Sequence, residues 1–180
     1  MRERVVESRS GDHRRSECEC AVTDELSQSR AAFLDRVASE IETLGWHVTV
    51  VEDTPRYAHT TGLTKSFAHP EILVIGLPVS SIAEVVHEAA RQVAAGARFR
   101  DEETSSTIFD GLSAAFRAVP LVSVLDYCAA ARAYYDFPPD VLQLVWPDAQ
   151  GRWPWDANAD AVYRLQQPVL ADLAGRDRTG

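Results

Sequence analysis

The sequence predicts an α+β fold, a two-layer domain in which a mostly antiparallel or mixed sheet packs with three to four helices. Three observations predict it. Short apolar runs rich in β-branched residues follow one another early in the chain, helices intervene later, and strict strand–helix alternation is absent. A barrel-like closure of the sheet is one form that this pattern allows. No Gly-x-Gly-x-x-Gly turn joins a strand to a helix, so a dinucleotide-binding fold is not expected.

The N-terminal segment is charged and nearly free of large apolar residues. This composition predicts that residues 1–20 form a disordered tail. A helix is then predicted from Thr23 to Leu44, because apolar side chains recur at helical spacing and Gly45 suits a helix C-terminus. The expected organisation is a single α+β domain over residues 21–175, with 1–20 and 176–180 disordered.

Six segments have the character of strands, because they combine apolar or alternating residues with turn-forming residues at their ends. The first two flank an Asp-Thr-Pro turn and predict a hairpin. The third and the last are almost entirely apolar, which is typical of buried strands. A polar loop is expected over residues 104–113. The predicted strands are residues 46–52, 56–63, 71–78, 98–103, 114–120 and 141–146.

Three further helices are predicted. The first begins at a capping box formed by Ser81 and Glu84 and ends at Gly96. The second covers residues 124–136, is capped by Ser123 and is stopped by two prolines. The tail from Asn158 has helical spacing that a proline interrupts.

Composition and charge limit the classes of function. At 180 residues, with 46% hydrophobic and 25% charged residues, the chain has the composition of one globular domain. Its formal net charge of −9 repels a phosphate backbone, so nucleic acid is not an expected partner. Neither a secretory h-region nor a membrane-spanning apolar run is visible, which predicts a cytoplasmic protein without a membrane partner. Abundant arginine and alanine, with Lys65 as the only lysine, indicate a bacterial source.

The segment His-Thr-Thr-Gly-Leu-Thr-Lys, residues 59–65, is the first candidate for chemistry. Hydroxyl groups, loop amides and one ammonium group can together hold a phosphate. We therefore assign Thr60, Thr61, Thr64 and Lys65 to the binding of an anionic cofactor or ligand, with FMN as one candidate. The alternative is an ordinary solvated loop, since threonine and serine are common in strands and turns.

His69 and Glu71 flank Pro70 and are the catalytic candidates. Proline holds the preceding residue extended, and a carboxylate beside an imidazole can orient it as a general base. A metal held together with His59 is an alternative, although no metal site is assigned. The structural alternative is an imidazole that donates to a backbone carbonyl. Gly62, earlier in the segment, would let a backbone or a ligand approach closely.

A second candidate segment is rich in tryptophan. Flat rings held by prolines can form a wall that stacks on a planar ligand, so Trp146 and Trp153 are assigned to the same ligand. The alternatives are that these rings and Trp155 belong to the core or anchor another protein. Gln143, inside a buried strand, needs hydrogen-bond partners, and Asp148 is expected to cap a turn.

Two segments together carry a family resemblance. Residues 59–78, with Thr-x-Gly-Leu followed by His-Pro-Glu, and residues 142–156, with Leu-Gln-Leu-Val-Trp-Pro-Asp and Pro-Trp, resemble the bacterial domain-of-unknown-function family 4262. The resemblance covers about residues 30 to 170. It departs at His59, where the family carries an aromatic residue such as tyrosine. The resemblance implies a domain and no particular reaction.

These observations lead to one functional expectation and one alternative. We expect a small-ligand or cofactor-binding domain, with a flavin as one candidate, that acts as an enzyme in an accessory or biosynthetic pathway. Its pocket would lie between the 59–71 and 143–156 segments, which must then be adjacent in space. The alternative is a non-catalytic protein-interaction domain that uses the Trp-rich loop at 146–155. A homodimer that buries these rings is a further expectation.

Overall fold

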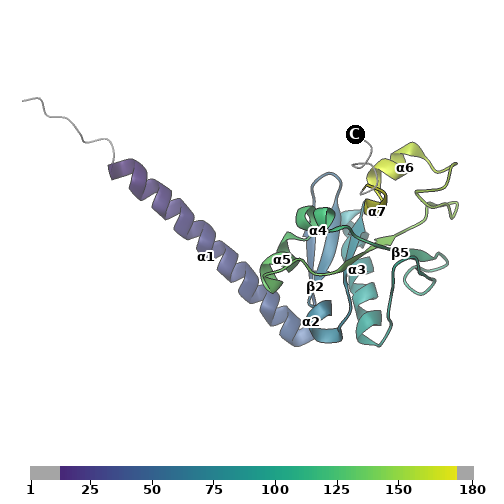
Figure 1. The fold of residues 1–180 in the computed structure, drawn as a ribbon, viewed down its shortest axis with the longest axis horizontal. Coiled ribbons are helices and arrows are strands. Elements are labelled where there is room, and N and C mark those ends of the chain that lie inside the picture. The colour runs from purple at the N-terminus through teal and green to yellow at the C-terminus, as the bar shows by residue number, and fades with distance from the viewer. Residues whose placement is uncertain (1–12, 174–180) are drawn as a thin grey trace, which may run out of the picture. The chain divides into compact units, whose positions relative to one another are not determined.

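The structure is a computed structural model that describes residues 13–173, with side chains from residue 27 to residue 172 (Figure 1). The chain divides into two compact units, residues 1–36 and 37–180, and the second contains the whole sheet. Helix α1 (His13–Leu44) begins at His13 instead of Thr23, so it includes residues 13–20, which the sequence analysis assigned to the tail. The predictions for 1–12 and 176–180 lie outside the described residues.

A six-stranded mixed sheet forms the centre of the second unit. Only the two central strands run parallel; every other neighbouring pair is antiparallel. The predicted α+β class with a mixed sheet is therefore confirmed. The sheet is open at both edge strands, so the barrel-like form is wrong. In the order β1-β2-β3-β6-β5-β4 the strands are β1 (His47–Val51), β2 (Tyr57–Thr61), β3 (Glu71–Ile75), β6 (Val141–Val145), β5 (Ala114–Ala118) and β4 (Thr104–Ser105).

The register of the central strands defines two edges of the sheet. Glu71 at the start of β3 lies opposite Val141 at the start of β6, and the pairing continues in parallel to Val74 and Leu144. We call the side where these two strands begin the N-terminal edge and the side where they end the C-terminal edge. β2 is antiparallel to β3, so Thr61 and the turn that follows it also lie at the N-terminal edge.

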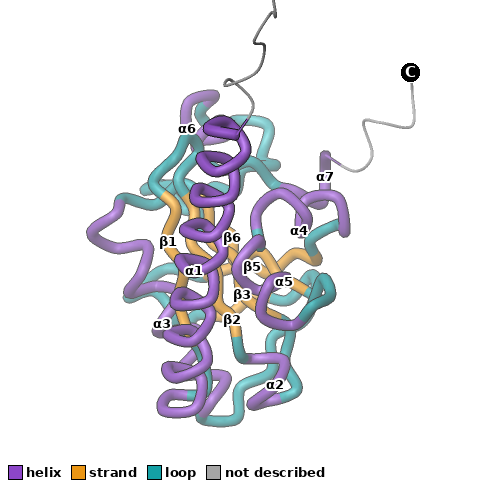
Figure 2. Tube along the Cα trace, turned by 90° about the vertical axis from the view of Figure 1, so that its left-hand side faces the viewer, coloured by secondary structure: helices purple, strands orange, loops and turns teal. Residues whose placement is uncertain are grey.

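Within residues 13–173 the structure has seven helices, more than the three to four expected. α3 packs on one face, and α4, α5 and α7 pack on part of the other (Figure 2). None of the helices within residues 13–173 is long and apolar enough to cross a membrane. Besides α1 the helices are α2 (Leu63–Phe67), α3 (Val79–Ala94), α4 (Leu121–Tyr127), α5 (Ala129–Tyr135), α6 (Ala161–Gln166) and α7 (Leu170–Leu173).

Two apolar clusters hold these layers together. Successive side chains of a strand point to opposite faces, so Ile72 and Val74 pack towards α3 while Leu73 and Ile75 pack towards α4, α5 and α7. All five residues of β3 are buried. This double burial explains why the strand reads as a continuous apolar run, as the sequence analysis expected for a central strand.

Several local predictions are wrong in detail. The predicted capping box is absent, because α3 begins at Val79 and Ser81 donates to the Pro78 carbonyl oxygen. Ser123 lies inside α4 and does not cap it. The single helix predicted over 124–136 is two helices that meet at Cys128.

One of the weaker strand predictions is also wrong. No strand forms over 98–103; the short β4 lies instead at the start of the predicted polar loop. Residues 98–103 and the following loop both carry charged or polar residues. An edge strand of two residues is too short to show the alternation of apolar and polar residues that identifies a strand. The predicted interruption of the C-terminal helix is present, since α6 and α7 lie on either side of Pro168.

A substitution at Gly76 tests how closely the chain packs at the C-terminal edge. A Cβ atom at this position would lie 2.3 Å from the Gln166 carbonyl oxygen, whereas a Cβ at Gly96 would meet nothing within 4 Å. Both glycines have positive φ, so both alanine variants carry backbone strain. We expect Gly76→Ala to lower the free energy of unfolding by about 1–3 kcal/mol more than Gly96→Ala, measured by urea denaturation. Equal losses would contradict the tight packing.

Candidate functional site

The carboxylate of Glu71 is the polar centre of the N-terminal edge. Its side chain is fully buried, and no cation pairs with it among the described residues. A buried charge is tolerated only where hydrogen bonds replace its water, and here five donors do so. They are Thr60 Oγ1 at 2.6 Å, Tyr135 Oη at 2.6 Å, and the backbone amides of Gly62 at 3.1 Å, Thr64 at 3.0 Å and Leu63 at 3.4 Å.

Gly62 makes this turn possible. Its φ is +121°, and a Cβ atom there would lie 2.8 Å from the Gly45 carbonyl oxygen and 2.9 Å from Trp46 Cα. The close approach expected at this glycine therefore exists, and the backbone at the end of α1 makes it. The turn brings three backbone amides onto Glu71 and begins the short helix α2.

Two of the four residues predicted to hold an anion, Thr60 and Thr64, instead donate to the protein's own carboxylate at Glu71. The Thr60 hydroxyl donates a hydrogen bond to Glu71, and the Thr64 hydroxyl donates one to the His69 carbonyl oxygen at 3.2 Å. Lys65 lies in α2, not in a loop, and its Nζ donates to Tyr134 Oη at 2.8 Å on the surface. Thr61 Oγ1 is buried without a hydrogen-bond partner among the described residues. The phosphate cradle is thus occupied by Glu71.

His69 is held by both ring nitrogens. Nδ1 donates to the Pro70 carbonyl oxygen at 2.7 Å, and Nε2 accepts from the Phe99 amide at 3.0 Å. These contacts require the neutral Nδ1–H form. Burial lowers the pKa of His69, against the smaller raising effect of its bond to Pro70. The imidazole links the loop at Phe99 to the start of β3 and does not hydrogen-bond to Glu71, which supports the structural alternative.

His59 follows the same pattern deeper in the sheet. It is 1% exposed, its Nδ1 donates to the Thr60 carbonyl oxygen at 2.9 Å, and burial lowers its pKa. Within the part of the chain that the structure describes, no three histidine, cysteine, aspartate or glutamate side chains could hold a metal ion together. The alternative of a metal at His59, His69 and Glu71 is therefore not supported.

Two further buried groups on this side of the sheet keep their protons. Tyr135 Oη donates to Glu71 and accepts from the Gly62 amide, and burial together with the nearby carboxylate raises its pKa. Burial raises the pKa of the Cys128 thiol to about 12, with the Glu71 charge adding to the effect. A thiol with this pKa is protonated at neutral pH and is a poor nucleophile.

The residues of the second segment lie at the C-terminal edge. Trp146 directly follows β6, its Nε1 donates to the Ile75 carbonyl oxygen at 3.0 Å, and its ring packs edge-on against Tyr163. It also packs against the core cluster beneath α3. Trp146 therefore ties β3 and α6 together. This is the core alternative that the sequence left open for it, and it is not a free stacking surface.

The loop after Trp146 is rigid and presents aromatic rings. Asp148 caps it, accepting from the Gln150 and Arg152 amides at 2.9 Å each, as predicted. Beyond this turn Trp153 and Trp155 stack, with ring centroids 5.3 Å apart and planes 10° from parallel. The Arg117 guanidinium lies 4.5 Å from the centre of the Trp155 ring, which is a cation–π distance.

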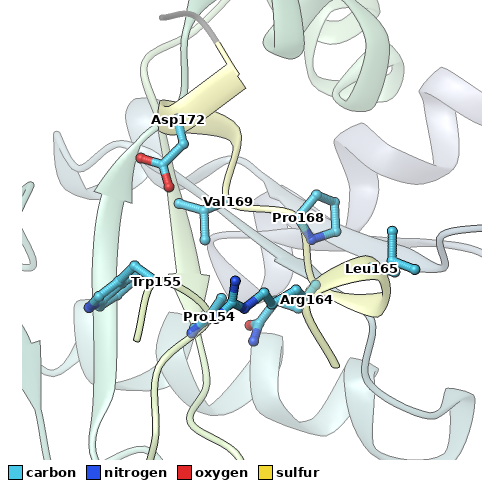
Figure 3. A pocket seen from close by; sticks show the side chains of 8 residues that line it. Pro154, Trp155, Arg164, Leu165, Pro168, Val169 and Asp172 are labelled. Atoms are coloured by element: carbon cyan, nitrogen blue, oxygen red, sulfur yellow. The ribbon is translucent and has the colours of Figure 1, made fainter. Parts of the chain in front are cut away.

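A hollow of about 460 Å³ opens beside Trp155 (Figure 3). Its wall combines the Trp-rich loop with α6 and with the segment that enters α7. Figure 3 shows apolar side chains and two opposite charges around the same space. The lining residues are Pro154, Trp155, Arg164, Leu165, Gln167, Pro168, Val169 and Asp172.

The two predicted segments lie at opposite edges of the sheet. The Glu71 site lies where β3 and β6 begin, and the Trp-rich loop lies where they end. At about 3.3 Å per residue, the five residues of β3 separate them by about 13 Å of buried strand. Thr60, His69 and Glu71 therefore lie at the opposite edge of the sheet from the loop that carries Trp153, although β3 and β6 themselves are neighbours. This arrangement does not support one shared pocket, which stays a prediction.

Sequence reasoning missed the distant partners of both sites. Tyr135 is 64 positions from Glu71, and only the dense Tyr-Tyr-Asp-Phe run marked its neighbourhood. Arg164 and Asp172 lie in a helical tail that had no assigned role. Trp155 was named only in the structural alternatives, although its Trp-Pro-Trp spacing to Trp153 was visible in the sequence.

Two neighbouring tyrosines test the Glu71 site. Tyr135→Phe removes a buried donor from the carboxylate, so we expect the free energy of unfolding to fall by about 1–3 kcal/mol. Tyr134→Phe removes only an exposed contact with Lys65 and should change it by less than about 0.5 kcal/mol. Chemical denaturation of both variants gives the comparison. Similar effects for the two variants would contradict the proposed role of Tyr135.

The buried histidines predict a pH dependence of stability. The pKa values of His59 and His69 are lowered from 6.5 in the folded state, so the unfolded chain binds protons more readily as pH falls. Their contribution is present above about pH 6.5 and is lost below it. We expect the Cε1–H resonance of His69 to titrate with a midpoint below pH 6.5 in NMR titration. Titration at or above pH 6.5 would show that the imidazole is not held neutral.

The sequence model of the family described as Domain of unknown function (DUF4262) matches residues 40–160. No curated protein and no solved structure matches the chain. The match contains the Thr-x-Gly-Leu and His-Pro-Glu residues that meet at Glu71, and the Leu-Gln-Leu-Val-Trp-Pro-Asp residues that build the C-terminal edge. It covers well over half of the chain, and the protein therefore belongs to the DUF4262 family.

Proposed function

We propose that this protein is a small-ligand-binding domain and that its site is the hollow beside Trp155. The observation that carries the proposal is the shape and lining of that hollow. Its volume of about 460 Å³ lies within the range of small-molecule sites, about 300–1,000 Å³. Such sites combine apolar walls with a few charged or polar groups, and here apolar side chains accompany Arg164 and Asp172.

The walls of the hollow are held in place without a ligand. Gln143 in β6 donates to the Pro168 carbonyl oxygen at 2.8 Å and accepts from the Leu170 amide at 2.9 Å. Gln167 bonds in the same two-sided way to the backbone of Trp146. Both glutamines are fully buried. A preformed wall lowers the entropic cost of binding, which supports a ligand site at this edge.

The floor of the site is fixed from the other side. The Asp156 carboxylate accepts from the Trp153 amide at 2.7 Å, which closes the tryptophan loop. Arg164 donates to the carbonyl oxygens of Asp156 and Ala157, which joins that loop to α6. The ring of Trp155 is therefore presented on a rigid support, as an aromatic anchor of a binding site should be.

The chemistry of the lining favours a compact organic ligand with a planar or apolar body and one polar group. The body would lie against Trp155, Leu165 and Val169, and the polar group would meet Arg164 or Asp172. A flavin phosphate gains nothing from the predicted cradle, because Glu71 already occupies those donors. If a flavin binds, its ring system and not its phosphate should carry the affinity.

Binding of planar probes tests this proposal. We would titrate indole, lumichrome, riboflavin and FMN into ¹⁵N-labelled protein and follow the four indole N–H resonances. We expect at least one probe to shift the Trp155 resonance, with riboflavin and FMN alike in affinity. Trp155→Ala should weaken that binding by at least about fivefold, about 1 kcal/mol.

Phe137→Ala is the matched control, because Phe137 is an exposed aromatic residue outside the hollow. This variant should bind each probe as the wild type does. If no probe shifts the Trp155 resonance, or if Trp155→Ala binds unchanged, the hollow is not a site for planar ligands.

The exposed part of Trp155 favours a second candidate, a non-catalytic protein-interaction domain anchored at the same loop. Trp155 is 39% exposed and stacked on Trp153, and exposed tryptophans are frequent anchors of interfaces. The volume of the hollow, about 460 Å³, favours the small ligand over this candidate. A bacterial source, a cytoplasmic location and a homodimer stay predictions from the sequence.

A further inference from the structure

A second hollow lies on the other flank of α6, between that helix and the turn that joins β1 and β2. Its volume is about 320 Å³. Arg56 from the start of β2 lines it, together with Gly76, which follows β3, and with Val162 and Leu165 from α6. None of these residues was assigned to chemistry by the sequence, and the hollow is separate from the one beside Trp155, although Leu165 lines both.

The guanidinium group of Arg56 is incompletely satisfied. Its Nε atom is buried and has no hydrogen-bond partner among the residues that the structure describes. None of the ion pairs within those residues involves Arg56. A buried donor without an acceptor costs free energy, and a guanidinium group is built to bind a carboxylate side-on through Nε and one terminal nitrogen. The hollow thus contains a cation that makes no ion pair within the described part of the chain, not even with Asp53 at its rim.

An exposed apolar strip adjoins this cation. Val162 and Leu165 are three positions apart in α6 and share one side of the helix. Val162 is 60% exposed and Leu165 is 79% exposed. Leu165 has the largest exposed fraction of the described large apolar residues. The helix that carries them is capped by Asp160, which accepts from the Val162 and Tyr163 amides. The strip is therefore in a fixed position beside Arg56.

We infer that this hollow is a binding site for a small carboxylic acid with an apolar chain. The carboxylate pairs with Arg56 and accepts from its Nε, which requires the guanidinium group to turn towards the hollow. The chain covers Val162 and Leu165 and removes their apolar surface from water. Asp53, at the exposed rim of the same hollow, repels a second negative charge and so favours a monocarboxylate.

This site does not depend on the function proposed for the Trp155 hollow. A protein of net charge −9 repels anions in general, so affinity for a carboxylate needs a local cation. Arg56 supplies it next to an apolar surface, and neither feature alone would select an amphiphilic acid. The inference therefore concerns the combination of the two.

Titration with octanoate and with octanamide, its neutral analogue, tests the site. We expect octanoate to bind at least about tenfold more tightly, because a charge-assisted hydrogen bond is lost with the amide. Octanoate should shift the backbone amide resonances of Gly76 and Val162 and leave the Trp155 indole resonance unchanged. Arg56→Gln should reduce octanoate affinity by at least about tenfold and bring it to the level of octanamide.

Arg91→Gln is the matched control, because it removes the same charge from an exposed arginine of α3 that pairs with Glu88. Its affinity for octanoate should equal that of the wild type. A second variant, Leu165→Ser, should weaken octanoate without changing its preference over octanamide. Circular dichroism spectra identical to the wild type would show that each variant is folded.

Three results would overturn the inference. Arg56→Gln could bind octanoate unchanged, octanoate could shift only the Trp155 indole resonance, or octanamide could bind as tightly as octanoate. A fourth result would refute the ligand class: acetyl-Leu-Leu with a free carboxylate could bind more tightly than octanoate. The natural ligand would then be a peptide C-terminus and not a free carboxylic acid. Failure of the planar probes at Trp155 leaves the Arg56 site unaffected.

Discussion

The N-terminal half of this fold depends on how one buried negative charge is solvated. Among the residues that the structure describes no cation pairs with Glu71, and hydroxyl and amide donors are brought to it from elsewhere in the chain. The need for these donors positions the end of β2, the turn at Gly62, the short helix α2 and the end of α5 around the first residue of β3. A carboxylate without these donors could not be buried. The Thr-x-Gly-Leu and His-Pro-Glu segments of the family therefore form one structural unit in this protein.

The two edges of the sheet differ in how their polar side chains are used. At the N-terminal edge Glu71, His59 and His69 all bond to neighbouring protein atoms, although Thr61 Oγ1 stays without a partner among the described residues. At the C-terminal edge the buried glutamines Gln143 and Gln167 hold segments that leave hollows between them. A motif rich in functional groups therefore need not be the place where a ligand binds. The polar side chains near Glu71 mostly hydrogen-bond to other protein atoms, so few of their donors and acceptors are left for a ligand.

The sequence predicted what depends on local pattern and missed what depends on distant partners. Strand β6 and the hairpin of β1 and β2 follow from short apolar and β-branched runs between turn residues, and the structure has them within one or two positions. Thr60 and Thr64 were recognised as residues that bind an anion, because hydroxyl groups and loop amides stood close together, whereas Glu71 was assigned separately to a catalytic pair with His69. Which anion they bind could not be predicted, since the answer required the position of their own carboxylate and of Tyr135. The start of α1 was missed because charged residues can continue a helix whose apolar pattern begins later.

Leu165 is a wall of both hollows that flank α6. A ligand on one side that changes the rotamer of this side chain changes the shape of the cavity on the other. Thermodynamic reciprocity then requires that each ligand alter the affinity of the other by the same factor. If both cavities bind ligands, this exposed leucine on a six-residue helix would couple them, and the sign of the coupling would depend on whether both ligands prefer the same position of the Leu165 side chain.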